Sequence, residues 1–211
     1  MNPPGPSTLV CFAVREEAAP FRAVAPADTR VLVTGMGAAN AALRLRRHLV
    51  THLPRRVVTA GYAGGLNPDL PAGTVLFSTE RDPELTSRLP EAGAVPGTFH
   101  CASRVAVTTA EKRNLREATG ADAVEMESGI IADVCREHLL PVATVRVILD
   151  PADADLPLDF NALMTPRHTV CLGRLIGHLL LHPGAVPRLL RFRRECARAA
   201  QRLAKVLRAA L

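Results

Sequence analysis

Aromatic side chains are scarce in this 211-residue chain, which has no Trp, one Tyr and six Phe. Leu, Val and Ala must therefore build most of the hydrophobic core. No apolar run reaches the roughly 18 residues that a membrane-spanning helix needs. The opening residues, MNPPGPST, lack the charged and apolar regions of a secretory signal. From these absences we expect a globular protein of the cytoplasm.

The sequence also lacks the patterns of disulfide-stabilised and metal-binding proteins. Its five cysteines are widely spaced and include no C-x-x-C pair: Cys11, Cys101, Cys135, Cys171 and Cys196. Free thiols of this kind suit a reducing compartment. His178 and His182 have the spacing of metal ligands, but no Glu lies between them and no third ligand is near. We therefore expect no metal site.

A dinucleotide-binding turn is also incomplete. Residues 35–40, GMGAAN, follow a short apolar run and precede a helical pattern. A dinucleotide site would place Gly at the sixth position and an acidic residue about 20 residues further on. Here the sixth position is Asn40, and the next acidic residue is Asp69. We expect no nucleotide cofactor, which leaves little support for an oxidoreductase.

Positive charge is concentrated at the C-terminal end. Residues 188–211 contain seven Arg, one Lys and one Glu, a local charge of +7 in a chain whose net charge is +6. Apolar residues recur there at helical spacing: Leu189, Phe192, Cys196, Ala199, Leu203, Val206 and Ala210. We favour a core-packed helix with a solvated basic face, and contact with an anionic membrane surface is the alternative. The segment carries no interleaved aromatics or DNA-reading motif, so we expect no nucleic acid partner.

The length and pattern favour a single α/β domain spanning residues 1–211, with a core at 8–155 and a helical C-terminal extension at 156–211. We expect strands at 8–14, 30–34, 56–60, 74–79 and 142–149. We expect helices at 38–51, 110–119, 128–137, 170–181 and 188–211. Small residues at 61–65 predict a turn, the proline-rich segment 81–98 predicts irregular surface structure, and 156–165 predicts a loop with a short helix.

Residues 121–150 combine the most informative features of the chain. Glu125 and Glu127 flank Met126 and precede a helical pattern, and an apolar strand interrupted by Arg146 then ends at Asp150. An acidic residue at the carboxyl end of a buried strand lies where open α/β sheets place their ligand crevice. Taken singly, each feature is also typical of a solvated helix start or of a turn.

Taken together, these features resemble the superfamily of purine nucleoside phosphorylases and nucleosidases. The resemblance covers about residues 9–155 and rests on VEMES at 124–128, VRVILDPAD at 145–153, TAGYAGGLNPDLPAGTV at 59–75 and VCFAVREEA at 10–18. The stretch at 10–18 is similar to the opening strand of methylthioadenosine/adenosylhomocysteine nucleosidases. The resemblance to the superfamily implies a single-domain, three-layer α/β/α phosphorylase-type fold with a central mixed, partly barrel-like sheet and C-terminal helices, and it implies a homodimer.

The resemblance also implies roles for individual residues. Asp150 corresponds to the acid that protonates the leaving purine, and Glu17 to the residue that positions and deprotonates the attacking water. Glu127 corresponds to the acceptor for the ribose hydroxyls, with Met126 packed on the ribose. The other residues that we expect around the nucleoside are Val124, Glu125, Gly37, Ala60, Gly61, Tyr62, Ala63 and Gly64.

Either water or phosphate can attack the sugar in this superfamily. Phosphorylases of this kind grip phosphate through an Arg two positions before a conserved glycine, and this chain has Thr59 there. Tyr62 also replaces the hydroxyl residue that follows the glycine. Arg15 and Arg44 could compensate, so phosphate stays open as the alternative. The presence of Glu17 and the absence of the turn Arg favour hydrolysis.

The C-terminal section, with HPGAVPRLLRFRR at 182–194, resembles the hopanoid-associated subgroup, whose members act on adenosylhopane. It therefore favours an adenine nucleoside with an apolar 5′ substituent; methylthioadenosine, adenosylhomocysteine, futalosine and simple purine nucleosides stay open. Leu149 stands where a Ser normally precedes the catalytic Asp, so we expect Asp150 to lack one orienting hydrogen bond. Leu149 and Tyr62 also leave open a nucleoside-binding module without catalysis, against which the retention of Glu17, Glu127 and Asp150 speaks.

Overall fold

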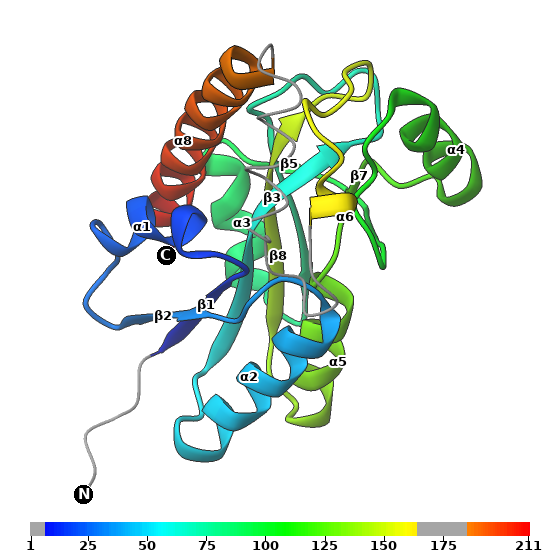
Figure 1. The fold of residues 1–211 in the computed structure, drawn as a ribbon. Helices are drawn as coiled ribbons and strands as arrows, with labels where there is room; N and C mark the ends of the chain where they lie inside the picture. The colour runs from blue at the N-terminus through cyan, green and yellow to red at the C-terminus, as the bar shows by residue number, and fades with distance from the viewer. Residues whose placement is uncertain (1–6, 164–184) are drawn as a thin grey trace, which may run out of the picture.

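The structure, a computed structural model, describes residues 7–163 and 185–211. Within these ranges, eight strands form one mixed sheet (Figure 1). The main path runs β2 (Thr29–Val33), β1 (Thr8–Phe12), β3 (Arg56–Gly65), β8 (Val142–Asp150), β4 (Val75–Glu80) and β5 (Val95–Pro96). Two short strands, β7 (Ala123–Glu125) and β6 (Phe99–Cys101), branch from the end of β3.

Strand direction decides where the polar ends of the strands meet. β1, β2, β3 and β8 are mutually parallel, whereas β4 runs antiparallel to β8. The carboxyl ends of β1, β3 and β8 therefore lie at one edge of the sheet. This mixed sheet agrees with the fold expected from the sequence.

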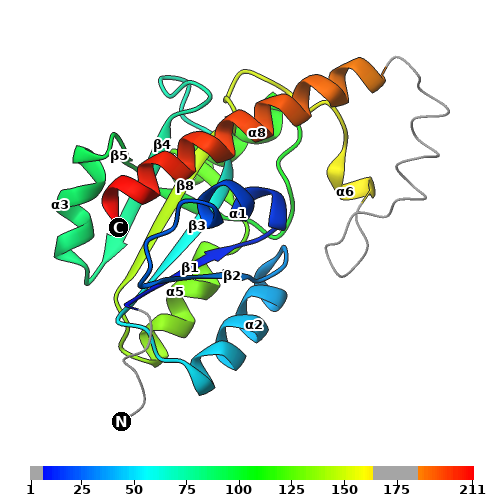
Figure 2. The same ribbon diagram turned by 90° about the vertical axis from the view of Figure 1, so that its left-hand side faces the viewer.

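Helices cover both faces of the sheet (Figures 1 and 2). On one face, α1 (Arg15–Arg22), α3 (Pro83–Glu91) and α8 (Ala185–Ala210) share a hydrophobic cluster with the sheet. On the other, α2 (Ala38–Thr51) and α5 (Ser128–Glu137) form a second cluster. Two further helices, α4 (Thr109–Thr119) and the short α6 (Phe160–Leu163), lie near the carboxyl ends of the strands. The three-layer α/β/α arrangement is confirmed.

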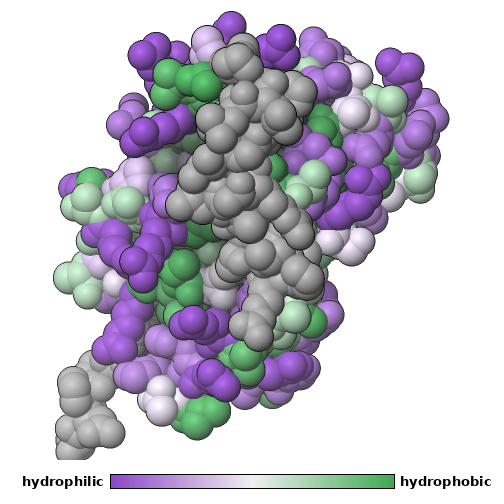
Figure 3. All heavy atoms as spheres, viewed as in Figure 1, coloured by the Kyte–Doolittle hydropathy of each residue, from purple (hydrophilic) through white to green (hydrophobic). Residues whose placement is uncertain are grey.

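The long helix α8 confirms the expectation of a core-packed helix over its second half. Apolar residues from Ala199 to Ala210 are buried against α1, α3 and β8. The arginines stay exposed, as do Val186 and Leu190 near the N-terminal end. Figure 3 shows mainly hydrophilic side chains over α8, with a hydrophobic patch near that end. Within the described ranges, no helix combines the length and apolar content needed to cross a membrane.

Two predictions of local structure were wrong. Residues 61–65 continue β3 instead of forming a turn, because they pair with β8 up to a bulge at Ala63/Gly64 and then with β7. Residues 81–98 are not irregular throughout, because they contain α3. Asp82 caps this helix by accepting a hydrogen bond from the Leu85 N–H at 3.0 Å, and a proline at the first position needs no hydrogen-bond donor.

The remaining predictions of elements agree with the structure to within a few residues, and helix α8 begins at Ala185, ahead of Pro187. The apolar helix predicted at 170–181 and the His178–His182 pair lie outside the described residues.

Candidate active site

A cavity of about 260 Å³ opens at the carboxyl ends of β1, β3 and β8. Parallel strands place such a crevice where their carboxyl ends meet. Carboxylates and apolar side chains share its wall. The polar and ionisable residues lining it include Glu17, Tyr62, Arg104, Glu125, Glu127, Asp150 and Cys196. The apolar part includes Met36, Val105, Val124, Met126, Leu149, Leu156, Phe160 and Phe192.

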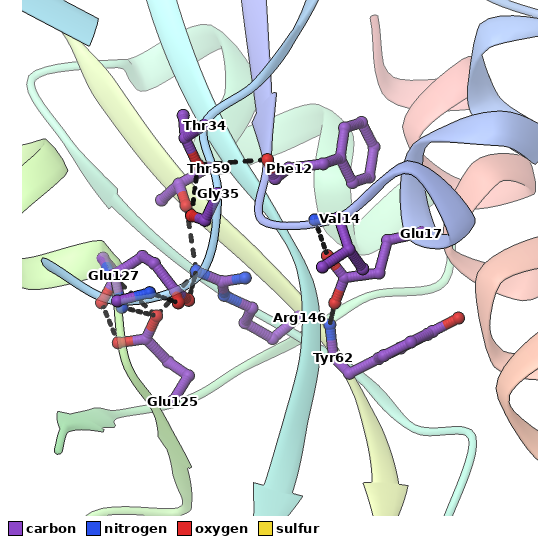
Figure 4. A network of polar contacts seen from close by, with 12 residues as sticks. Phe12, Val14, Glu17, Thr34, Gly35, Thr59, Tyr62, Glu125, Glu127 and Arg146 are labelled. Carbon is purple, nitrogen blue, oxygen red and sulfur yellow. Dashed lines mark hydrogen bonds and ion pairs between the residues drawn. The ribbon is translucent and has the colours of Figure 1, made fainter. Parts of the chain in front are cut away.

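A buried arginine lies among the carboxylates beside this cavity (Figure 4). Arg146 comes from the middle of β8 and is 1% exposed. One of its terminal nitrogens lies 2.6 Å from an oxygen of Glu125 and 3.0 Å from the Thr59 hydroxyl, to which it donates. The same nitrogen lies 3.8 Å from Glu127. A buried charge is stable only with such partners, so Arg146 and Glu125 form a fixed ion pair.

Glu125 binds Arg146 and also fixes the start of α5. Its carboxylate accepts hydrogen bonds from the backbone N–H groups of Glu127 and Ser128 and from the Ser128 hydroxyl. Burial pushes the pKa of Glu125 up, but the charge of Arg146 and these hydrogen bonds outweigh it, so the pKa lies below its usual value. Glu125 is therefore ionised and structural, and it fixes the position of the neighbouring Glu127.

Glu127 lies farther from Arg146 than Glu125 does, at 3.8 Å instead of 2.6 Å. It accepts a hydrogen bond from the Gly37 N–H at 2.7 Å, which connects the start of α5 to the start of α2. Burial raises the pKa of Glu127, and the charge of Arg146 opposes the rise only in part. An acceptor of this kind, held in a cavity wall, suits hydroxyl groups of a ligand.

Glu17 reaches the cavity from the first turn of α1. Its two oxygens accept hydrogen bonds from the Tyr62 N–H at 3.0 Å and the Val14 N–H at 3.3 Å. Burial raises the pKa of Glu17 to about 7, although these hydrogen bonds and the charge of Arg146 oppose the rise. A carboxylate with this pKa can accept a proton near neutral pH.

Glycine is required where Glu17 and Arg146 approach β3. A Cβ at Gly61 would lie 2.5 Å from a terminal nitrogen of Arg146 and 2.9 Å from an oxygen of Glu17. Figure 4 shows Arg146 between Glu17 on one side and the Glu125–Glu127 pair on the other. Gly61 thus supports the site by leaving room, and it does not line the cavity itself.

Asp150 ends β8 and lines the cavity. Its Oδ2 atom lies 2.5 Å from the ammonium nitrogen of Lys112, a fully buried residue of α4. Burial raises the pKa of Asp150 to about 6, while Lys112 opposes the rise. A carboxyl group in this range can deliver a proton to a ligand at mildly acidic pH.

An apolar wall comes from the C-terminal part of the chain. The rings of Phe160 on α6 and Phe192 on α8 lie 5.6 Å apart between centroids. The Tyr62 hydroxyl donates to the Cys196 carbonyl at 2.9 Å, so the polar end of Tyr62 points to α8 (Figure 4). Tyr62 therefore offers mainly its ring to the cavity.

Most of the residues expected at the site come together. Nine line the cavity: Glu17, Tyr62, Ala63, Gly64, Val124, Glu125, Met126, Glu127 and Asp150. Gly37 supports Glu127 through its backbone. Ala60 lies instead in the hydrophobic core between sheet and helices, because its position on β3 faces α1 and α8.

The sequence prediction missed several residues at the site. The sequence could have predicted Arg146, because a single charged residue inside a buried strand needs carboxylate partners. Phe192 and Cys196 belonged to a recognised apolar helix face, but that pattern does not say which surface the helix covers. Lys112 carried no signal, because it lies in a polar helical segment beside the exposed Arg113.

This geometry can be compared with known proteins. Residues 27–90 and 79–180 match the profile of the phosphorylase superfamily. The chain belongs to this superfamily. The match contains β3, β4, β7 and β8, so it includes Glu127 and Asp150.

Relatives within the phosphorylase superfamily agree with this membership. The 5′-methylthioadenosine/S-adenosylhomocysteine nucleosidase of Glaesserella parasuis serovar 5 (strain SH0165) is 28% identical over 170 residues, which covers 65% of this chain and 74% of the relative. The fold is similar to that of the Campylobacter jejuni 5′-methylthioadenosine/S-adenosylhomocysteine nucleosidase, with a TM-score of 0.71, 16% identity and 98% of each chain covered. It is also similar to the futalosine hydrolase of Helicobacter pylori strain 26695, with a TM-score of 0.70, 17% identity and 96% of each chain covered.

Proposed function

We propose that this protein hydrolyses the N-glycosidic bond of an adenine nucleoside that carries an apolar 5′ substituent. One observation carries the proposal: Asp150 and Glu17, two carboxyl groups with raised pKa values, line the same cavity together with Glu127. Superfamily relatives named as nucleosidases support the same reaction.

The two carboxyl groups suit an acid and a base. Protonated Asp150 donates its proton to the leaving adenine, at N7, while the bond from C1′ to N9 breaks. Water adds to C1′ of the oxocarbenium-like sugar, and its proton passes to ionised Glu17. Glu127 accepts hydrogen bonds from the ribose hydroxyls. The products are adenine and the free sugar, and solvent then restores the proton to Asp150 and removes it from Glu17.

Water is the nucleophile that the charges in the cavity favour. A phosphate ion needs cationic or N–H donors, and Arg104 is the sole cation among the described residues that line the cavity. Arg104 is paired with Glu111 at 2.5 Å, and Arg146 is committed to Glu125. Arg15 and Arg44 are exposed and do not line the cavity. Phosphorolysis is therefore the second candidate.

An apolar 5′ group fits the wall formed by the C-terminal part of the chain. Phe160, Phe192 and Leu156 line the cavity together with Leu149 and Asp150. Such side chains bind an apolar group by removing its surface from water. An adenosylhopane-like substrate matches this wall.

Two further expectations stay predictions. The resemblance implies a homodimer, and the basic helical segment 188–211 could contact an anionic membrane.

Adenine release tests this proposal. Wild type is assayed without phosphate on 5′-methylthioadenosine and on adenosine with a long apolar 5′ group, beside Asp150→Asn and a matched control, Asp153→Asn. Asp153 is exposed and lies three residues further along the chain, in the loop after β8. We expect phosphate-independent release, preference for the apolar substrate, and a loss of at least about 100-fold in Asp150→Asn only.

Two outcomes contradict the proposal. Release that requires phosphate would identify a phosphorylase. Tight binding of the nucleosides with no release under either condition would identify a binding module.

A further inference from the structure

Lys112 is a charged residue that the proposed reaction leaves unexplained. Its side chain is fully buried, although lysine is usually exposed. Three oxygens surround its ammonium nitrogen: Asp150 Oδ2 at 2.5 Å, the Pro151 carbonyl at 2.8 Å and the Ala154 carbonyl at 2.7 Å. The two carbonyls accept hydrogen bonds from the ammonium group, and Asp150 forms an ion pair with it.

The two carbonyl contacts determine what happens when Asp150 changes its charge. A lysine held by the carboxylate alone would lose its partner whenever Asp150 became protonated. Here the Pro151 and Ala154 carbonyls hold the ammonium group in place in both states. Lys112 therefore provides a fixed positive charge beside a group whose own charge changes.

The contact also distinguishes the two oxygens of Asp150. Oδ2 forms the ion pair with the ammonium group, and a neighbouring positive charge disfavours a proton on that oxygen. The proton of the neutral acid is then on Oδ1. Leu149 precedes Asp150 and has no hydrogen-bonding side chain, so this contact takes the place of the orienting hydrogen bond that Leu149 cannot supply.

We propose that Lys112 is a positioning residue for the acid Asp150, which fixes Oδ2, leaves the transferable proton on Oδ1 and stabilises the carboxylate that remains after transfer. This inference rests on the proposed function of Asp150. In the step concerned, the Oδ1–H bond breaks, a bond from hydrogen to N7 of adenine forms, and the electron pair of the O–H bond stays on Asp150. Lys112 keeps all its protons throughout.

Few other charged groups are placed to produce this effect. The Cys196 thiol of α8 also interacts electrostatically with Asp150. Asp155, Glu195 and the exposed arginines 188, 191, 198 and 202 share a neighbouring surface groove with Asp150, and Glu17, Arg104, Glu125 and Glu127 share the cavity. Lys112 is the cation in direct contact. Its charge lowers the pKa of Asp150 against the effect of burial.

Lys112→Gln tests this role, because the amide keeps hydrogen-bond donors for the carbonyls and removes the charge. The matched control is Arg113→Gln, which removes an exposed cation from the next position of α4. The Asp150 carboxyl is titrated by carbon-13 NMR in the full chain, with its signal assigned through Asp150→Asn. Adenine release from 5′-methylthioadenosine is measured against pH for the same proteins.

In Lys112→Gln we expect the pKa of Asp150 to rise by about one to three pH units. The optimum for adenine release should rise by about half as much, and kcat at the optimum should fall at least about tenfold, because the acid is weaker. Arg113→Gln should change neither. A purely structural role would lower activity at every pH without moving the optimum, and that result would overturn the proposal.

The two measurements separate this inference from the proposed function. An unchanged Asp150 pKa in folded Lys112→Gln would overturn the role of Lys112 itself. A raised pKa with an unmoved optimum would overturn Asp150 as the acid, and the inference with it. If Lys112→Gln does not fold, wild type decides: the nitrogen-15 signal of the Lys112 ammonium must titrate with the midpoint of Asp150, and a signal that does not follow it would overturn the contact.

Discussion

Arg146 and Glu125 form an ion pair at 2.6 Å whose side chains are only 2% and 1% exposed. The pair spans from the middle of β8 to the end of β7, next to Glu127 and across from Glu17. It neutralises one carboxylate of the site and leaves Glu17 and Glu127 with raised pKa values. Because Arg146 pairs with Glu125, Glu125 has a structural role, and Glu17 and Glu127 are left for chemical roles.

Removing Arg146 should destabilise the fold strongly. Arg146→Met leaves Glu125 buried without its cation, and we expect a loss of about 3–5 kcal/mol in the free energy of unfolding. Urea unfolding at neutral pH measures it. Arg136→Met is the control, because Arg136 makes exposed ion pairs with Glu80 and Asp133 and its loss should lower the free energy of unfolding far less. Equal losses of unfolding free energy in the two variants would show that the buried pair stabilises the fold no more than an exposed pair does.

Gly61→Ala should reduce activity through the position of Glu17. The added Cβ would lie too close to both Arg146 and Glu17, so the carboxylate must move. Moving a catalytic group by about 1 Å lowers kcat/KM by about 100-fold. Gly129→Ala on α5 is the control, because its Cβ would meet Cys101 at 3.4 Å, an ordinary contact. Kinetics of adenine release compare the two, and full activity in Gly61→Ala would refute the tight placement of Glu17.

Adenine release should depend on pH as a bell-shaped curve. The reaction needs Asp150 protonated and Glu17 ionised, and their pKa values lie at about 6 and about 7. We therefore expect kcat/KM to be greatest at about pH 6.5 and to fall on both sides. The two values belong to the pair of groups, because either proton arrangement gives the same curve. A rate that stays constant from about pH 7 to about pH 9 would contradict the acid role of Asp150.

Glu17 should make the fold less stable as pH rises. Folding raises the pKa of Glu17 from 4.5 to about 7, so the folded state binds the proton more tightly. Stability is then lost as pH rises through this window, by about 3 kcal/mol in total. Relative to wild type, Glu17→Gln should be more stable at about pH 9 than at about pH 5 by about 2 kcal/mol in urea unfolding. Glu16→Gln, an exposed neighbour, should show no such difference.

The sequence predicted the elements that carry a clear hydrophobic pattern. Strand β8 and helices α2 and α5 agree with the prediction because their apolar residues follow the period of each element. Helix α3 differs from the prediction because prolines usually break helices, whereas Pro83 occupies the first turn, where proline fits. The end of β3 was missed because small residues are typical of turns, whereas here they leave room for buried side chains.

The site was predictable where motif residues follow strands closely. Asp150 ends β8 and Glu127 lies two residues beyond the end of β7, as the order of the motifs indicated. Lys112 could not be predicted, because its partners lie 38 to 42 residues away in the chain and only the fold brings them together. The same holds for the contact between Tyr62 and Cys196, which are 134 residues apart.

The nature of the sugar product tests the central claim most directly. Wild type is incubated with 5′-methylthioadenosine in phosphate buffer, and the products are followed by proton and phosphorus-31 NMR, with Glu17→Gln beside it. We predict one free sugar for each adenine released, no sugar 1-phosphate signal, and a loss of at least about 100-fold in Glu17→Gln. A sugar 1-phosphate that appears in step with adenine would contradict attack by water and would remove Glu17 from its role as the base.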